Sequence, residues 1–191
     1  MDVENIFSEL AAHMIKGFMT HELLANYYAF LNLEGYAKCH EYHYISESVS
    51  YRKLCQYYMS HHDRLIRNSK VETPQIIPNG WFDYTKQDVD PKTKRSAIEH
   101  GMKLWVDWES ETKELYENMH AEFVAAGNVA DALMLEDYIL DVDDELAFAT
   151  NEHINAKSID YDLSVIIPCQ KEMRDLYCEK IDRISDYICQ K

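Results

Sequence analysis

Carboxylate, histidine and tyrosine side chains recur at helical spacing within otherwise apolar stretches of this sequence. The residues on these stripes are Glu22, Tyr58, His61, Glu109, Glu136 and Asp143. A buried carboxylate costs free energy unless it is paired, protonated or bound to a metal ion. Carboxylates from several helices that meet a histidine can hold iron or manganese inside a helical bundle. The pattern therefore leaves two alternatives, a mid-bundle metal site or polar residues that turn to the helix flanks and form ion pairs.

A second ligand-rich segment is Cys39-His40-Glu41-Tyr42-His43. His40 and His43 could share one face of a helix, but the H-E-x-x-H spacing of a zinc protease is absent. The same spacing is absent after His21-Glu22. The sequence therefore disfavours a zinc site here, and it contains no glycine-rich phosphate loop and no nucleophile elbow.

The chain is strongly acidic, with 34 acidic and 19 basic residues and a formal net charge of −15. Such a chain should be repelled by nucleic-acid phosphates and anionic membranes, so we expect neither direct nucleic-acid binding nor membrane association. A metal ion or a basic protein partner is compatible with this charge. The 5 cysteines are odd in number and form no C-x-x-C pair. Free thiols and an acidic amino terminus without a signal peptide indicate a cytoplasmic protein.

Helical periodicity and few turn residues predict an all-α fold, since only 5 glycines and 4 prolines occur in 191 residues. Asp90-Pro91 is a typical helix start, and Gly127-Asn128 is typical of a short turn between two helices. Gly35 is a plausible stop for the first helix. The segment from Val71 to Pro91, with Trp81 and Phe82, reads as a long connection. The expected helices span 3–33, 36–69 with an irregular start, 91–127, 129–156 and 168–190.

These lengths predict a single domain over residues 1–191. Four long helices at about 3–157 would form a four-helix bundle with a long crossover between the second and third helices, which then run parallel. An additional C-terminal helix at about 165–190 would pack at an end of the bundle or between subunits.

Four segments between about Phe18 and Glu152 resemble the four helices of ferritins. They are Glu22-Leu-Leu-Ala-Asn-Tyr-Tyr, His61-His62-Asp63-Arg64-Leu65, Glu109 with Ala126-Gly127-Asn128, and Leu135-Glu136-Asp137 to Asp143. The resemblance implies a ferritin-like fold with Glu22, His61, Glu109 and Asp143 at ligand positions, and Glu136 as a further polar site. It also places Tyr58 where ferritins have a bridging glutamate. A phenol is a poor metal bridge, which argues against ferroxidase activity.

Two functions follow from this reading. The first is a ferritin-like protein that binds iron or manganese at an altered mid-bundle site and forms a homo-oligomer. The second is a metal-free acidic protein that acts through protein–protein contacts as an inhibitor or nucleic-acid mimic. Cys39-His-Glu-Tyr-His43 and Trp105-Val-Asp-Trp-Glu109 also resemble small acidic proteins of Firmicutes and their prophages, which favours the second.

Overall fold

The computed structural model describes residues 2–67, 70–76, 85 and 89–189, with side chains as far as 184. Within these residues the chain forms five α-helices and no β-strand. The helices are α1 (Val3–Phe30), α2 (Glu34–His62), α3 (Pro91–Ala125), α4 (Val129–Ser158) and α5 (Leu163–Cys189). The all-α prediction is therefore confirmed.

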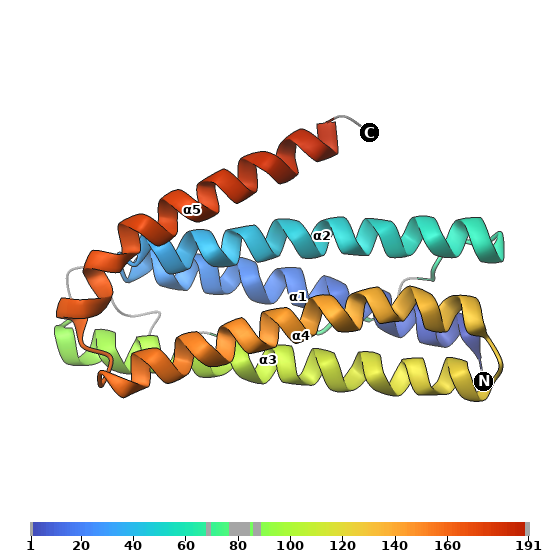
Figure 1. The fold of residues 1–191 in the computed structure, drawn as a ribbon, viewed down its shortest axis with the longest axis horizontal. Helices are drawn as coiled ribbons and strands as arrows, with labels where there is room; N and C mark the ends of the chain where they lie inside the picture. The colour runs from blue at the N-terminus through green and yellow to red at the C-terminus, as the bar shows by residue number, and fades with distance from the viewer. Residues whose placement is uncertain (1, 68–69, 77–84, 86–88, 190–191) are drawn as a thin grey trace.

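Helices α1 to α4 lie side by side in a bundle with one long crossover (Figure 1). α1 and α2 are antiparallel, as are α3 and α4, whereas α2 and α3 run in the same direction. The connection between α2 and α3 therefore spans the length of the bundle, as the sequence predicts. α5 contacts α2, and its C-terminal end points away from the bundle (Figure 1).

The helix starts and stops follow local chemistry. Asp2 accepts hydrogen bonds from the backbone N–H groups of the first turn of α1. Asp90 accepts from the N–H groups of Lys92 and Thr93 at 2.8 and 3.0 Å, and Pro91 occupies the first position of α3. Gly127 has a φ of 72°, the left-handed conformation that commonly ends a helix, and separates α3 from α4.

Three boundary predictions are wrong. α2 ends at His62, where Asp63 has a φ of 53°, rather than at 69. The chain reverses after α1 at Asn32, which has a φ of 57°, and α2 is regular from Glu34 onward. Gly35 therefore lies inside α2, where an added Cβ would be 2.7 Å from the backbone oxygen of Gln170 on α5. α5 starts at Leu163 rather than 168, because Asp162 accepts a hydrogen bond from the N–H of Ser164 at 2.9 Å.

The crossover is anchored before it reaches α3. Ile76 is buried, and its backbone oxygen accepts a hydrogen bond from His100 Nε2 at 3.0 Å. Trp81 and Phe82, which the sequence places on this connection, lie outside the described residues. Among the described helices, none is long and apolar enough to cross a membrane.

A polar layer separates two apolar clusters in the core. One cluster includes Leu24, Cys39 and Trp105, and the other includes Met14, Leu54 and Tyr116. On α1, α2 and α3 the buried residues between the clusters are largely polar. They are Thr20 and His21, His40 and His43, and Glu109 and Thr112. This layer, in the middle of the bundle, holds the candidate site.

Candidate metal centre

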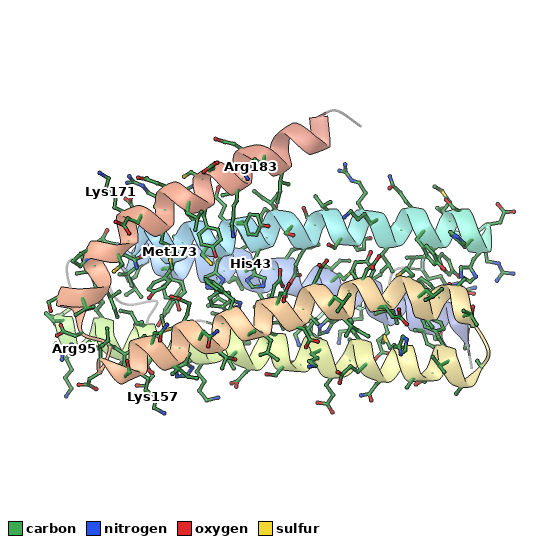
Figure 2. The ribbon with its side chains drawn as sticks, in the orientation of Figure 1. His43, Arg95, Lys157, Lys171, Met173 and Arg183 are labelled. Carbon is green, nitrogen blue, oxygen red and sulfur yellow. The ribbon has the colours of Figure 1, made fainter. Side chains whose placement is uncertain are left out.

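All four bundle helices contribute donor side chains to the polar layer. α1 supplies His21, and α2 supplies His40, His43 and Glu47 one helical turn apart. α3 supplies Glu109, and α4 supplies Glu145. Figure 2 shows His43 directed from α2 toward α4. The site therefore combines imidazole nitrogens and carboxylate oxygens from four helices.

His21 lies between two carboxylates. Its Nε2 atom is 3.4 Å from Glu47 Oε1 and 3.4 Å from Glu109 Oε1, and its side chain is fully buried. Burial alone would lower the pKa of His21, but the adjacent Glu109 and Glu47 carboxylates raise that pKa to about 9. The imidazole is therefore protonated at neutral pH and forms ion pairs with both carboxylates.

His21 also contacts a second buried histidine. His21 Nδ1 lies 3.0 Å from His40 Nδ1, so one of the two nitrogens must carry a hydrogen and donate a hydrogen bond to the other. Burial and the charges of His21 and His43 lower the pKa of His40 well below its usual value. Protonated His21 is therefore the donor and neutral His40 the acceptor. This bond fixes the His21 ring with its Nε2 toward the carboxylates.

A second ion pair lies beside the first. His43 Nδ1 is 3.1 Å from Glu145 Oε1, which links α2 to α4. Burial would lower the pKa of His43, but the charge of Glu145 raises it well above its usual value. Burial raises the pKa of Glu47, and the His21 contact only partly opposes this effect. The centre thus holds three carboxylates against two imidazolium rings.

Several buried nitrogen and oxygen atoms of the centre have no hydrogen-bond partner. Glu109 uses Oε1 to accept a bond from Trp105 Nε1 at 2.9 Å. These atoms are Glu109 Oε2, Glu47 Oε2, His40 Nε2 and His43 Nε2, whereas His21 Nε2 has the two 3.4 Å carboxylate contacts described above. Native proteins satisfy most buried polar atoms, so these atoms are the ones that a bound ion or water would contact.

A glycine makes room for one of these carboxylates. Gly17 lies on α1 one turn before His21, and a Cβ added there would be 1.9 Å from Glu47 Oε2. Glycine inside a helix costs about 1 kcal/mol relative to alanine. Its presence here allows the Glu47 carboxylate to reach the face of α1 and the centre of the bundle.

The oxygen and nitrogen atoms of this centre suit a hard divalent cation. In the structure, however, the carboxylates form ion pairs with His21 and His43, which occupy the space that a cation would take. Within the described ranges, no group of three or more His, Cys, Asp or Glu side chains is already arranged to hold a metal ion. Two ligands of one metal at about 2.1 Å are roughly 3 Å apart in an octahedral site. The 3.4 Å separations at His21 Nε2 are close to this spacing, so small side-chain shifts would open the site.

Of the six stripe residues that the sequence singles out, only Glu109 lies at this centre. Glu22 is exposed and accepts a bond from Asn26 at 3.2 Å. His61 is exposed, and its Nδ1 lies 3.0 Å from the backbone oxygen of Tyr57. The expected inward orientation of Glu22 and His61 is therefore wrong.

The two α4 residues form ion pairs on the flank of the bundle. Glu136 Oε1 is 3.5 Å from His120 Nε2, and Asp143 Oδ1 is 2.5 Å from Lys113 Nζ. The structure does not bring Glu136 and Asp143 to Glu109. The flank alternative of the sequence analysis describes these two residues.

Tyr58 lies away from the centre. It is buried in the apolar cluster near the N-terminus of α1, where its ring centroid is 4.6 Å from that of Phe7. The expected buried position is confirmed, but Tyr58 does not replace a carboxylate at the centre. Glu47, three turns earlier on α2, is the carboxylate that α2 contributes there.

Two sequence signals could have located the centre. On α1, Leu10, Met14, Gly17, His21 and Leu24 recur at the spacing of the stripe that is buried. The segment from Cys39 to His43 is ligand-rich, although its spacing does not match a zinc motif. Together they supply three of the histidines and the glycine of the centre.

No protein-family model and no curated protein matches the sequence. Comparison with solved structures finds archaeal ferritins. A humanized archaeal ferritin superposes with a TM-score of 0.75 and 13% identity, over 90% of this chain and 94% of that chain. The chain has a ferritin-like fold.

Two further ferritin structures agree with this assignment. An engineered closed form of the Archaeoglobus fulgidus ferritin gives a TM-score of 0.73 at 15% identity, over 90% of this chain and 93% of that chain. The open-pore ferritin of the same archaeon gives 0.74 at 13% identity, over 91% and 96%. The ferritin-like bundle expected from the sequence is therefore confirmed, together with its crossover and additional helix.

Proposed function

We propose that this ferritin-like protein binds a divalent metal ion, iron or manganese, in the middle of its bundle. The ligands would come from His21, His43, Glu47, Glu109 and Glu145. The supporting observation is the set of buried, unsatisfied nitrogen and oxygen atoms contributed by α2 and α3 at one level of the core. Carboxylates with a few imidazoles suit Fe²⁺ and Mn²⁺.

The residues have separable tasks in this proposal. Glu109 would offer its free Oε2 atom, because Trp105 holds Oε1 and fixes the carboxylate plane. Glu145 and His43 would close the site from the side of α4 and α2. His21 would bind through Nε2, with its orientation set by His40. Bound iron would supply one-electron chemistry at a position between the two apolar clusters.

A bound metal ion would replace the positive charge that protons on two histidines supply in its absence. His21 and His43 are both positively charged in the structure described here, because their carboxylate neighbours raise their pKa values. A divalent ion that displaces these two protons leaves the total charge of the centre unchanged. Metal binding should therefore release protons, as expected for neutral imidazole ligands.

The test is metal content and affinity in matched variants. The purified chain would be analysed for bound metal, then stripped with a chelator and titrated by calorimetry with Mn²⁺ and, without oxygen, Fe²⁺. Glu109→Gln should weaken binding by at least about tenfold. Glu22→Gln and Glu136→Gln change exposed carboxylates and should bind as the wild type does. Equal affinity in Glu109→Gln, or no binding by the wild type, would overturn the proposal.

The ion pairs themselves favour a second candidate, a metal-free acidic protein that acts through protein contacts. In this alternative the His21 and His43 charges permanently neutralise the centre, and the net charge of −15 attracts a basic partner. Capture of a basic nucleic-acid-binding protein should then occur at low salt and be lost at high salt. Capture that is absent, or unchanged by salt, would contradict this alternative.

We further propose that the protein works in the cytoplasm as a homo-oligomer. Cys39, Cys55, Cys169 and Cys178 are free thiols, which suits a reducing compartment. Gel filtration with light scattering gives the number of chains in a particle. A monomer over the micromolar range would contradict the oligomer.

A further inference from the structure

A large cavity lies against the candidate metal centre and extends toward the surface. Its volume is about 670 Å³, within the usual range for small-molecule sites. α2 and α4 form its walls, α5 lies over one part, and Glu109, Thr112 and Tyr116 of α3 form its floor. The lining includes exposed residues, such as Asp144 and Glu172, so a small molecule could enter.

The inner end of this cavity presents unsatisfied polar atoms. His43 is 4% exposed and Glu109 1% exposed, and both line the cavity. His43 Nε2, Glu109 Oε2 and Glu47 Oε2 have no hydrogen-bond partner. These buried atoms give the cavity a polar and predominantly acceptor-rich end.

The wall formed by α4 carries several carboxylates, and Lys53 is the basic residue whose charge acts on one of them, Asp141. Asp141, Asp144 and Glu152 line the cavity, and among the described residues none of them has a basic nitrogen within 4.0 Å. Burial raises the pKa of Glu152, and burial followed by the charge of Glu145 raises that of Asp141. Partly desolvated carboxylates of this kind would be stabilised by a positive charge in the cavity.

An aromatic pair formed by one residue of α2 and one of α5 already contacts a cation. The ring centroids of Tyr42 and Tyr177 are 5.6 Å apart. Lys180 Nζ lies 5.2 Å from the first centroid and 4.7 Å from the second. These distances are within the range of cation–π attraction. Lys180 is also the one lysine or arginine in the described lining of the cavity.

We infer that this cavity binds a small organic cation, an alkylammonium ion. Its charged group would sit over the Tyr42 and Tyr177 rings, where the Lys180 ammonium now lies, and its substituents would extend along the wall that carries Glu152. Aromatic faces next to carboxylates recognise ammonium groups and exclude anions. The inference does not depend on the metal, since the aromatic pair and Glu152 are not among the proposed metal ligands.

The test measures the binding of benzyltrimethylammonium to the full chain by calorimetry. Each titration is made twice, once with protein as purified and once after a chelator. The anion phenylacetate and the neutral benzyl alcohol are the comparison ligands. The cation should bind at least about tenfold more tightly than either of them in both preparations, because only the cation gains the aromatic and carboxylate contacts.

Variants locate the charged group. Lys180→Ala removes the competing ammonium and should tighten binding of the cation about fivefold, whereas Tyr177→Leu should weaken it about fivefold. Glu152→Gln keeps the side-chain shape and should also weaken binding. Lys171→Ala changes an exposed lysine of α5 outside the cavity lining and should have no effect.

Equal or tighter binding of phenylacetate or benzyl alcohol would overturn the inference. Affinity that is unchanged in both Lys180→Ala and Tyr177→Leu would do the same. Failure of the metal proposal has a different signature, which is normal binding of the cation by a protein that takes up no Mn²⁺ or Fe²⁺.

Discussion

His21 Nε2 lies 3.4 Å from Glu109 Oε1, between α1 and α3 in the middle of the bundle. The same nitrogen is equally close to Glu47 Oε1 of α2. A positively charged ring therefore stands among carboxylates of two other helices, where a metal ion would also be stabilised. This relationship connects the stability of the fold to its proposed metal chemistry.

Removal of His21 should destabilise the metal-free protein. In His21→Ala, the Glu47 and Glu109 carboxylates lose their buried counter-ion, which costs about 3 kcal/mol of unfolding free energy. The adjacent Glu22 is exposed, and Glu22→Ala should change the free energy of unfolding by less than about 0.5 kcal/mol. Urea unfolding of chelator-treated proteins measures both. Similar losses in the two variants would contradict the ion-pair role of His21.

The stability of the metal-free protein should fall at alkaline pH. The pKa of His21 is raised to about 9 in the folded protein from 6.5. Its stabilising effect is thus fully present below pH 6.5 and is lost as the pH rises through about 9. The difference in unfolding free energy between wild type and His21→Gln should shrink between pH 7 and 10. A difference that stays constant over this interval would show that His21 does not titrate there.

Gly17→Ala should disturb the centre without unfolding the protein. The added Cβ would be 1.9 Å from Glu47 Oε2, the end of a flexible side chain, so the carboxylate must move away. The gain in helix propensity offsets part of the cost, and the Trp108 ring must shift slightly. Affinity for Mn²⁺ should fall about tenfold, as in Glu47→Gln. Wild-type affinity in Gly17→Ala would place Glu47 outside the site.

Asp131 should be important for stability but not for metal binding. It is 1% exposed and accepts hydrogen bonds from Tyr57 OH at 2.8 Å and His62 Nε2 at 3.0 Å, which ties the start of α4 to the end of α2. Asp131→Ala should cost about 2 kcal/mol, whereas the exposed Asp137→Ala should be near neutral. Thermal unfolding measures the difference. An osmolyte that keeps Asp131→Ala folded should restore its affinity for Mn²⁺. Lower Mn²⁺ affinity in the folded variant would show that Asp131 also contributes to metal binding.

The fold could be predicted from the sequence because its signals are local. Asp90-Pro91 sets the start of α3, and Gly127 sets the turn before α4. Because glycine and proline are scarce elsewhere, the sequence predicts long helices. The long proline-containing segment between the second and third helices predicts a crossover connection rather than a short turn. The sequence does not predict the regular start of α2, because glycine commonly ends a helix. Gly35 instead lets α5 approach α2 closely.

The site could be predicted only in part because α1 and α4 carry apolar residues on more than one face. On α1, Phe18 and Met19 suggested a stripe through Glu22, but the buried stripe runs one residue earlier, through His21. A step of one residue turns the direction of a side chain by about 100°. On α4, Leu133 and Leu140 are exposed, so the stripe through Glu136 faces outward. On α3 a single apolar face made Glu109 recognisable.

The most direct measurement is the position of a bound metal. Crystals of the full chain grown with Mn²⁺ would be measured at a wavelength where manganese scatters anomalously. The proposal predicts a peak in the anomalous difference map among His21, His43, Glu47, Glu109 and Glu145, which disappears in Glu109→Gln. Crystals with no peak at this position, or with a peak at Glu22, His61 or Asp143 instead, would contradict it.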